Sequence, residues 1–362
     1  MTTSMMEADT TERAIAAACE NVRVRREQAG DRTFVGLYQD GGIGDLMRQI
    51  AFARAVRRRF PAAYILLVCR DLGEDADGRP MVANIVGGTD AVDATLCLPP
   101  IQCRRVTALL YDLFDVFYRV GYVVEAWYWR LSEGEGDAAE EQRQADLHLQ
   151  PFRRFAAKFP TSSAGIRELQ MTQWEVMRRS SGLDVSEDDL AIETGECPEW
   201  LSRKRCAVVH NMCGGMALAK SAPMSVFSRL IAELGKRRVR CVQLGAPNDP
   251  AIPGAKDFRG LPIRDSAEVL RRATLLIDVE GGLGYIARAV GTRRACFFGP
   301  TPPELFRFER DLILSTRKCE PCWHTTERWS VSCPEQWPCC RNIPTDAEQI
   351  ATILAPYARG EK

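Results

Sequence analysis

The sequence predicts an α/β protein with two Rossmann-like domains that face a cleft, and two observations lead to this fold. Short apolar runs of strand length alternate with segments whose apolar residues recur at helical spacing. The alternation occurs twice, with the polar segment 133–146 between the two series. Alternating strands and helices form parallel sheets with right-handed crossovers. A chain of 362 residues is long enough for two such domains, each with its own core.

The elements are expected in the following order. Residues 1–30 form an N-terminal helical extension, capped near Thr10 and stopped at Gly30. An N-terminal domain covers 31–190, and its strand candidates are 32–39, 63–70, 92–99 and 120–127. A C-terminal domain covers 191–345, and its strand candidates are 206–211, 239–245, 273–282 and 293–300. Residues 346–362 form a last helix, expected to pack back on the N-terminal domain.

Composition excludes several classes of protein. The hydrophobic share of 46% and the charged share of 27% are those of a soluble globular chain. The 48 basic residues balance the 48 acidic ones, which argues against a nucleic-acid partner. No apolar run approaches the ~18 residues of a transmembrane helix. The N-terminus lacks the apolar core of a signal peptide. We therefore expect a cytoplasmic protein.

The segment 319–340, CEPCWHTTERWSVSCPEQWPCC, contains five of the 14 cysteines. A reducing compartment favours a metal site over disulfides. Four thiolates form a closed tetrahedral zinc or iron site, which would order a loop that has few strand or helix signals. The candidate ligands are Cys319, Cys322 and Cys333 with Cys339 or Cys340, and His324 is an alternative for one sulfur. Free thiols around a tryptophan-lined core are the competing interpretation. The nine scattered cysteines read as small buried hydrophobes.

A first glycine-rich turn, DGGIGD, joins a strand to a helix at 40–45. Gly41, Gly42 and Gly44 let a ligand approach the backbone at a helix N-terminus, where amides bind anions. The turn lacks the G-x-G-x-x-G spacing, so a tight turn without a ligand is an equal alternative. Asp45 stands at the head of the helix, either as a cap or as a base.

A second such turn follows the strand that ends at Val279. The amides of Gly281, Gly282 and Gly284 would point at an anion at the carboxyl edge of the sheet, where open α/β sheets bind their ligands. Glu280, at the strand end, suits sugar or ribose hydroxyls. A dehydrogenase would instead show the dinucleotide fingerprint, which is absent.

Five motifs in order resemble glycosyltransferase family 9, the heptosyltransferases with the two-domain GT-B fold. They are LYQDGGIGDLMRQIAFARAVRRRFP, VVHNMCGGMALAKSAPMSVFSRLIAEL, VQLGAPNDP, EGGLGYIARAVGTRRACFFGPTPP, and the series CEPC, SCPE, CCRNI and DAEQIATILAPYA. The resemblance spans residues 33–358. The chain departs from the family pattern at four positions, which are Tyr285 for His, Glu280 for Asp, Ala222 for Trp and Cys340 for Met. A cysteine-rich tail is also similar to that of the autotransporter heptosyltransferases, a branch that holds iron in such a motif.

The resemblance implies an inverting transfer of a sugar from a nucleotide donor, with ADP-heptose as the commonest donor of the family. It assigns Asp45 as the base and Lys220, one of only seven lysines, as the phosphate ligand, with no divalent cation needed for catalysis. It favours Cys339 as the fourth metal ligand. The residues it implies for donor binding are Gly42, Gly44, Lys220, Asp249, Glu280, Gly281, Gly282 and Gly284.

The residues leave several points open. His210 is more often a structural residue at a strand end than a catalyst. A different nucleotide sugar, transferred to a small metabolite or a protein, is one alternative function. A non-catalytic metal-knuckle protein that binds nucleotides is another. The acceptor is not visible in the sequence, and self-association is left open.

Overall fold

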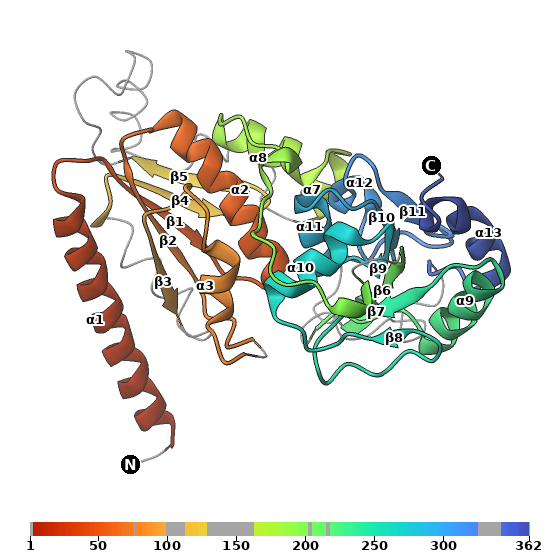
Figure 1. Ribbon diagram of the computed structural model, residues 1–362. Helices are drawn as coiled ribbons and strands as arrows, with labels where there is room; N and C mark the ends of the chain where they lie inside the picture. The colour runs from red at the N-terminus through yellow and green to blue at the C-terminus, as the bar shows by residue number, and fades with distance from the viewer. Residues whose placement is uncertain are drawn as a thin grey trace. The chain divides into compact units, whose positions relative to one another are not determined.

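The protein is described from a computed structural model (Figure 1). The structure describes residues 3–75, 77–98, 113–128, 163–201, 205–214, 218–324 and 342–361. The polar segment 133–146 and four cysteines, Cys103, Cys333, Cys339 and Cys340, lie outside the described residues. The chain divides into two compact units. The first contains Met1–Gly73, Gly88–Thr161 and Trp174–Asp189, and the second contains Glu74–Gly87, Ser162–Gln173 and Leu190–Lys362.

The first unit is built on a five-stranded sheet of order β3-β2-β1-β4-β5. Its strands are β1 (Phe34–Gln39), β2 (Tyr64–Arg70), β3 (Ala94–Leu98), β4 (Val116–Val120) and β5 (Val124–Tyr128). The first four are parallel, and β1 pairs with β2 from Phe34↔Tyr64 to Gln39↔Cys69. Almost every residue of β1 and β2 is buried, which explains why both read as continuous apolar runs.

Helices cover both faces of this sheet. Helix α1 (Thr3–Ala29) ends at Gly30, whose φ is +60°, and it contributes Val22 to a core shared with Phe34 of β1. Helix α2 (Ile43–Arg59) begins directly after the first glycine-rich turn. Its buried Gln49 donates to the carbonyl oxygens of Leu37 and Val68, at 2.9 and 3.1 Å, and so ties α2 to β1 and β2. The N-terminal helix therefore shares the core of the first unit.

The fourth predicted strand, 120–127, is wrong as a single strand. The chain turns back at Gly121, and β4 and β5 pair antiparallel with Val120 opposite Val124. A Cβ at Gly121 would lie 2.9 Å from the carbonyl oxygen of Val123, so the turn needs a glycine. An uninterrupted apolar run hides such a turn, because periodicity does not separate two short buried strands from one.

The second unit contains a six-stranded parallel sheet of order β11-β10-β9-β6-β7-β8. Its strands are β6 (Ala207–Val209), β7 (Cys241–Gln243), β8 (Lys256–Asp257), β9 (Leu275–Val279), β10 (Arg294–Phe297) and β11 (Leu312–Leu314). The four longer or central strands are those that the sequence predicted. The two edge strands, β8 and β11, are two and three residues long, too short to give a pattern.

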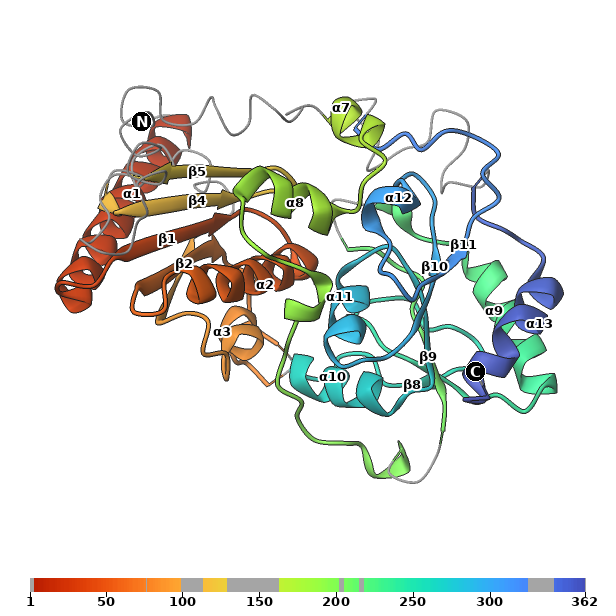
Figure 2. The same ribbon diagram turned by 90° about the horizontal axis from the view of Figure 1, so that it is seen from above.

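Helices α9 (Met224–Lys236) and α13 (Ala347–Ala358) pack together on one face of this sheet. Figure 2 shows α10 (Ile263–Arg272) and α11 (Gly282–Ala289) on the side of β9 away from them. The C-terminal helix, which was expected to pack on the N-terminal domain, shares the core of the second unit. Leu354 of α13 lies in the same core as Leu230 of α9, because an apolar helix face buries itself against any apolar partner nearby.

The remaining helices connect these layers. They are α3 (Met81–Val86), α7 (Ser163–Glu168), α8 (Gln173–Ser181) and α12 (Pro303–Phe306). Helix α3 belongs to the second unit, where Arg264 of α10 donates to the carbonyl oxygen of Asn84 at 2.9 Å. The last segment of the second unit begins at Leu190, and the segments around α3 and α7 also join that unit.

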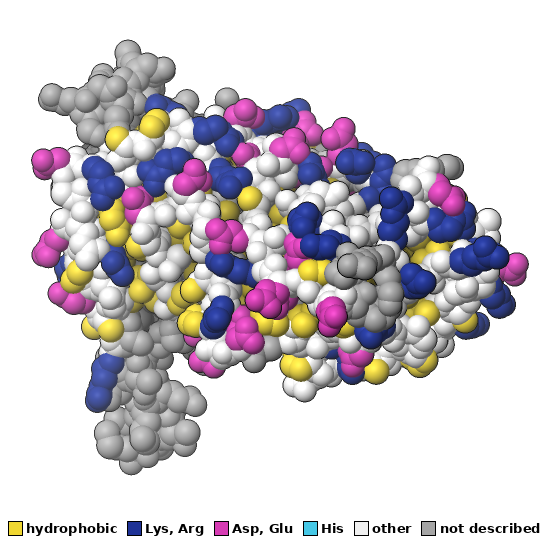
Figure 3. Space-filling model, in the orientation of Figure 1, with side chains coloured by type: hydrophobic (Ala, Val, Ile, Leu, Met, Phe, Trp, Pro, Cys, Tyr) yellow, Lys and Arg dark blue, Asp and Glu magenta, His cyan; other side chains and the backbone are white. Residues whose placement is uncertain are grey.

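The charges on the surface are mixed. Figure 3 shows basic and acidic side chains interspersed over the face that it presents. This agrees with the balanced numbers of basic and acidic residues in the sequence. Among the described helices, none is both long and apolar enough to cross a membrane.

Candidate functional site

The carboxyl edge of the second sheet gathers most of the residues predicted for donor binding. Because β6 and β9 are neighbouring parallel strands, the residues that follow them, His210 and Glu280, emerge at the same edge. Lys220 reaches this edge from a single helical turn, η4 (Leu218–Lys220). The sequence placed these residues in separate motifs, and the sheet brings them together.

Lys220 and Glu280 form a short, shielded ion pair. Their Nζ and Oε2 atoms are 2.5 Å apart, and the side chains are 14% and 6% exposed. Removing two charges from water is unfavourable unless each is compensated, and here each side chain is the partner of the other. The predicted phosphate ligand and the predicted hydroxyl ligand are thus paired with each other in the structure.

Helix α11 begins at the same place. Gly281 is its N-cap in extended conformation, and the first helical residues are Gly282, Leu283 and Gly284. The N-terminal amides of this helix therefore lie next in sequence to Glu280, at the positive end of the helix dipole. The ammonium of Lys220, paired with Glu280, and the N-terminus of α11 form an arrangement that can receive a diphosphate.

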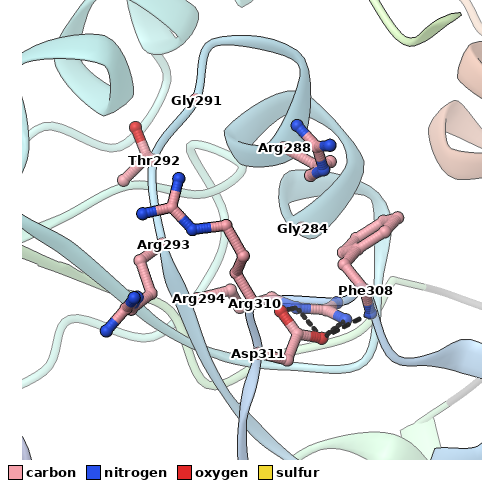
Figure 4. Close-up of a pocket in the computed structure, with 9 residues that line it drawn as sticks. All are labelled: Gly284, Arg288, Gly291, Thr292, Arg293, Arg294, Phe308, Arg310 and Asp311. Carbon is pink, nitrogen blue, oxygen red and sulfur yellow. Dashed lines mark hydrogen bonds and ion pairs between the residues drawn. The ribbon is translucent and has the colours of Figure 1, made fainter. Parts of the chain in front are cut away.

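A buried ion pair supports α11 from behind. Arg294 and Asp311 are 2% and 3% exposed, and their Nη2 and Oδ2 atoms are 2.5 Å apart (Figure 4). The guanidinium lies 4.6 Å from the ring centroid of Phe308. A Cβ at Gly284 would lie 2.2 Å from Nη1 of Arg294, so only glycine leaves room for this arginine. Gly284 therefore fixes the position of α11, a role that its place in the motif did not reveal.

Arginines line the small pocket around this pair. Figure 4 shows the Arg310 side chain extended toward Thr292 and that of Arg288 at the end of α11, whereas Arg293 points away from both. Arg293 instead stacks on Tyr357, with 4.9 Å to the ring centroid. The pocket lies at the amino end of β10 and at the C-terminus of α11, where basic side chains stabilise the helix dipole. The pocket is a supporting feature on the edge opposite the site.

His210 is held between two carboxylates. Its Nδ1 lies 2.8 Å from Oδ1 of Asp278, which is fully buried, and its Nε2 lies 3.5 Å from Oδ2 of Asp249. Burial alone would lower the pKa of His210, but the charges and hydrogen bonds of these two carboxylates outweigh it and raise the pKa to about 9. The imidazole is therefore cationic at neutral pH, which suits a structural ion and not a base.

The Asp249 carboxylate is occupied within its own loop. It accepts the Ala246 N–H at 2.7 Å and faces His210. Burial would raise the pKa of Asp249, but the hydrogen bonds from His210 and Ala246 lower it below the usual value. Gly245, with φ of +146°, makes room for this carboxylate, since a Cβ there would lie 2.3 Å from Oδ2. Asp249 thus shapes the loop after β7, and a role in holding ribose stays a prediction.

Cys213 lies beside the second glycine turn. Its backbone N–H donates to the Ser221 hydroxyl at 3.0 Å, and a Cβ at Gly281 would lie 3.7 Å from its sulfur. Burial raises the pKa of the Cys213 thiol to about 11. The thiol is neutral at physiological pH, so it is a packing group and not a nucleophile.

In the first unit, Asp45 closes the glycine-rich turn. Its Oδ2 accepts the N–H of Gly42, the N-cap of α2, at 3.1 Å, and its Oδ1 accepts from Arg48 at 2.7 Å. Arg48 is 2% exposed and lies over the ring of Tyr122, with 4.2 Å to the centroid. Asp45 itself is 31% exposed. The carboxylate is therefore both a helix cap and an accessible group whose orientation Arg48 sets.

The described part of the cysteine-rich segment is anchored to the second unit. The side-chain amide of Asn342 accepts from the N–H of Cys319 at 3.1 Å and donates to its carbonyl oxygen at 3.0 Å. Cys319 and Cys322 are both partly exposed, and neither forms a disulfide. Within the described ranges, no group of three potential metal ligands occurs. The other predicted ligands, Cys333 and Cys339, lie outside those ranges, so the metal site stays a prediction.

The next two residues reach the neighbourhood of Lys220. Trp323 is 2% exposed, and its backbone N–H donates to the carbonyl oxygen of Pro300 at 2.9 Å. Burial, and then the charge of Lys220, lower the pKa of His324. The sequence marked Trp323 only as part of a tryptophan-rich segment. No pattern placed it beside the donor residues, since that contact depends on how the tail folds back.

Comparisons with known proteins address the fold. No protein-family model matches the chain, and no curated protein matches it significantly. Solved structures do match. A family 9 glycosyltransferase from Veillonella parvula is 14% identical with a TM-score of 0.51, over 79% of this chain and 86% of that one.

Two structures of TibC, an iron-containing dodecameric enzyme, also match. One, from enterotoxigenic E. coli, is 17% identical with a TM-score of 0.57, over 92% of this chain and 80% of that one. The other, described as a heptosyltransferase, contains ADP-D-β-D-heptose and is 16% identical with a TM-score of 0.57, over 92% and 78%. The chain therefore has the α/β fold of these glycosyltransferases, with two parallel-sheet domains.

The raised pKa of His210 predicts a pH dependence of stability. The folded-state pKa of about 9 exceeds the ordinary histidine value of 6.5, so the stabilisation is complete below pH 6.5 and is lost as pH rises through about 9. At roughly 1.4 kcal/mol per pKa unit, the loss amounts to about 3 kcal/mol. Urea denaturation between pH 6 and 9.5 should show this decline in the wild type and a flatter profile in His210→Gln. Parallel profiles for the two proteins would contradict the assignment.

Proposed function

We propose that this chain is a glycosyltransferase of family 9 that transfers a sugar, with inversion, from a nucleotide-diphosphate donor to an acceptor nucleophile. The observation that carries the proposal is the shielded Lys220–Glu280 pair at the carboxyl edge of the second sheet, next in sequence to the N-terminus of α11. It belongs to a fold shared with TibC, which binds ADP-D-β-D-heptose. ADP-heptose is accordingly the donor we favour, and a dehydrogenase or a metal-knuckle adaptor is disfavoured.

In this proposal the donor diphosphate takes the place of Glu280 beside Lys220. The ammonium and the α11 amides then meet the phosphate charge, which grows as the sugar leaves, and no divalent cation is required. Glu280, released from the ion pair, accepts hydrogen bonds from donor hydroxyls. Gly281 and Gly282 keep the backbone open to the phosphates, while Gly284 keeps α11 in position.

The departures from the family pattern bear on the choice of donor. Tyr285, where the family usually has His, is 5% exposed, and its hydroxyl donates to Gln173 at 2.7 Å. Its ring also packs edge-on against Phe308. This position therefore serves packing at the start of α8. A family histidine that met the donor would have no counterpart here, which is the specific reason to test other nucleotide sugars as the second candidate donors.

For the acceptor, we propose that Asp45 removes the proton from the attacking group. The carboxylate is accessible and has a fixed orientation from Arg48 and Gly42. Gly42 and Gly44 leave the turn around it without side chains. The competing role is that of a helix cap alone. Asparagine separates the two, since its amide oxygen can still cap but cannot take up a proton.

We also propose a structural zinc or iron at Cys319, Cys322, Cys333 and Cys339. Cys319 and Cys322 are two residues apart in the sequence, and the hydrogen bonds of Asn342 to the Cys319 backbone support an ordered start of the segment. TibC, with the same fold, is iron-containing and dodecameric. A metal here would order the tail of the second unit, and self-association of this chain is a further point for light scattering to decide.

Removing the Lys220 ammonium should weaken nucleotide binding. Loss of a charge-assisted contact corresponds to about 1.5–3 kcal/mol, or about 10- to 100-fold in Kd. Titration calorimetry with ADP should show this for Lys220→Ala. Lys236→Ala, at an exposed lysine that is 69% accessible, is the matched control and should bind as wild type. Unchanged ADP affinity in Lys220→Ala would remove the basis of the proposal.

The donor is identified by a separate experiment. In it, a panel of ADP-, GDP-, UDP- and dTDP-sugars with NAD is compared by thermal shift.

Replacing Asp45 by Asn should abolish transfer and leave donor affinity nearly unchanged. Loss of a positioned base lowers turnover by roughly 100- to 10,000-fold. The control is Asp71→Asn, an exposed carboxylate directly after β2 of the same sheet, which should keep wild-type turnover. Turnover above half of wild type in Asp45→Asn, with the protein folded, would leave Asp45 as a cap only.

Elemental analysis tests the metal site on protein purified without an affinity tag or chelator. We expect about one zinc or iron per chain, with metal and thermal stability both lost in Cys319→Ser and in Cys333→Ser. Cys197→Ser, at a partly buried cysteine outside the segment, should retain both. Substoichiometric metal and wild-type stability in the two ligand variants would refute the site.

A further inference from the structure

Lys220 has a second neighbour besides Glu280. Its Nζ lies over the ring of Phe306 in α12, 5.7 Å from the centroid, within the range of cation–π attraction. Phe306 is 2% exposed. The ammonium is thus bounded by a carboxylate and by an aromatic face. The carboxylate can be exchanged for a phosphate, whereas the ring is a fixed wall of the protein.

Phe306 is itself held both at its backbone and at its ring. Its backbone carbonyl oxygen accepts from Nη2 of the buried Arg294 at 3.2 Å. Trp323 meets the ring edge-on, with centroids 5.2 Å apart and an interplanar angle of 84°, the geometry that aromatic pairs prefer. Arg294 fixes the backbone of α12, and the tryptophan fixes the ring.

Trp323 in turn is fixed by the segment that carries Cys319 and Cys322. Its backbone N–H donates to the carbonyl oxygen of Pro300 at 2.9 Å. The side-chain amide of Asn342 donates to the carbonyl oxygens of Gly299, at 3.2 Å, and of Cys319. Contacts therefore run without a gap from the cysteine turn through Trp323 and Phe306 to the Lys220 ammonium. All of them lie in the second unit.

We propose that Trp323 is a positioning residue for donor binding, which acts through Phe306 to hold the Lys220 ammonium where it meets the diphosphate. Lysine carries its charge on a flexible four-carbon stem, and fixing such a side chain costs conformational entropy at the moment of binding. A wall that limits the stem beforehand removes part of that cost and tightens binding. This inference rests on the proposed function, and it gives segment 319–324 a role in that site besides any metal.

A double-mutant cycle with ADP as the ligand tests this. The four proteins are wild type, Trp323→Leu, Lys220→Ala and the double variant, measured by titration calorimetry. We expect Trp323→Leu to weaken ADP about fivefold when Lys220 is present and less than about 1.5-fold when it is absent. Trp323→Phe, which keeps an aromatic edge, should restore most of the affinity. In donor kinetics, Trp323→Leu should raise KM with little change in kcat, as expected for a loss of uniform binding.

Stability is controlled within the same unit. Leu354→Ala removes a buried side chain from the α9–α13 core and should lower thermal stability while leaving ADP affinity unchanged. If Trp323→Leu does not fold, Phe306→Leu takes its place in the cycle with the same expectation. Equal weakening with and without Lys220, or affinity lost equally in Leu354→Ala, would overturn the positioning role. Unchanged affinity in Lys220→Ala alone would instead refute the proposed function, so the two failures are distinct.

Discussion

The second unit depends on the pairing of its buried charges with opposite charges, and the Lys220–Glu280 pair lies at the candidate donor site. At 14% and 6% exposure, neither charge is well hydrated, and each is stable there because the other is 2.5 Å away. A ligand that enters must provide equivalent compensation for the lysine. A diphosphate does this, and a neutral sugar does not. In the proposed function, the pair therefore favours a ligand with negative charge.

The same requirement explains the residues behind the site. His210 is charged because Asp278 and Asp249 flank it, and Arg294 is tolerated in the core because Asp311 accepts its hydrogen bonds. Each of these ions fixes a loop or helix that reaches the carboxyl edge, namely the loop after β7 and the helix α11. Buried ion pairs add little net stability compared with apolar packing, but they define one arrangement of the elements that they join.

The first unit solves a different problem with one carboxylate. Asp45 closes the turn before α2, takes its direction from Arg48, and remains about one-third accessible. The proposed base needs access to the acceptor, and the cap needs a fixed carboxylate. Arg48, stacked on Tyr122, reconciles the two demands by fixing the carboxylate from the protein side only.

The sequence by itself indicated most of the strands and helices, the two-domain α/β architecture, and the two turns at Gly42 and Gly281, because periodicity and glycine placement are local signals. It also marked Asp45, Lys220 and Glu280 as separate candidates. Only the tertiary structure decided that Lys220 pairs with Glu280, that Gly284 makes room for Arg294, that β4 turns back into β5, and that α13 packs on α9. It also placed Trp323 against Phe306, whose ring lies beside the Lys220 ammonium. Each of these depends on which residues meet across distant segments, and a one-dimensional pattern of polarity does not specify the partner that a buried charge or an apolar face will find.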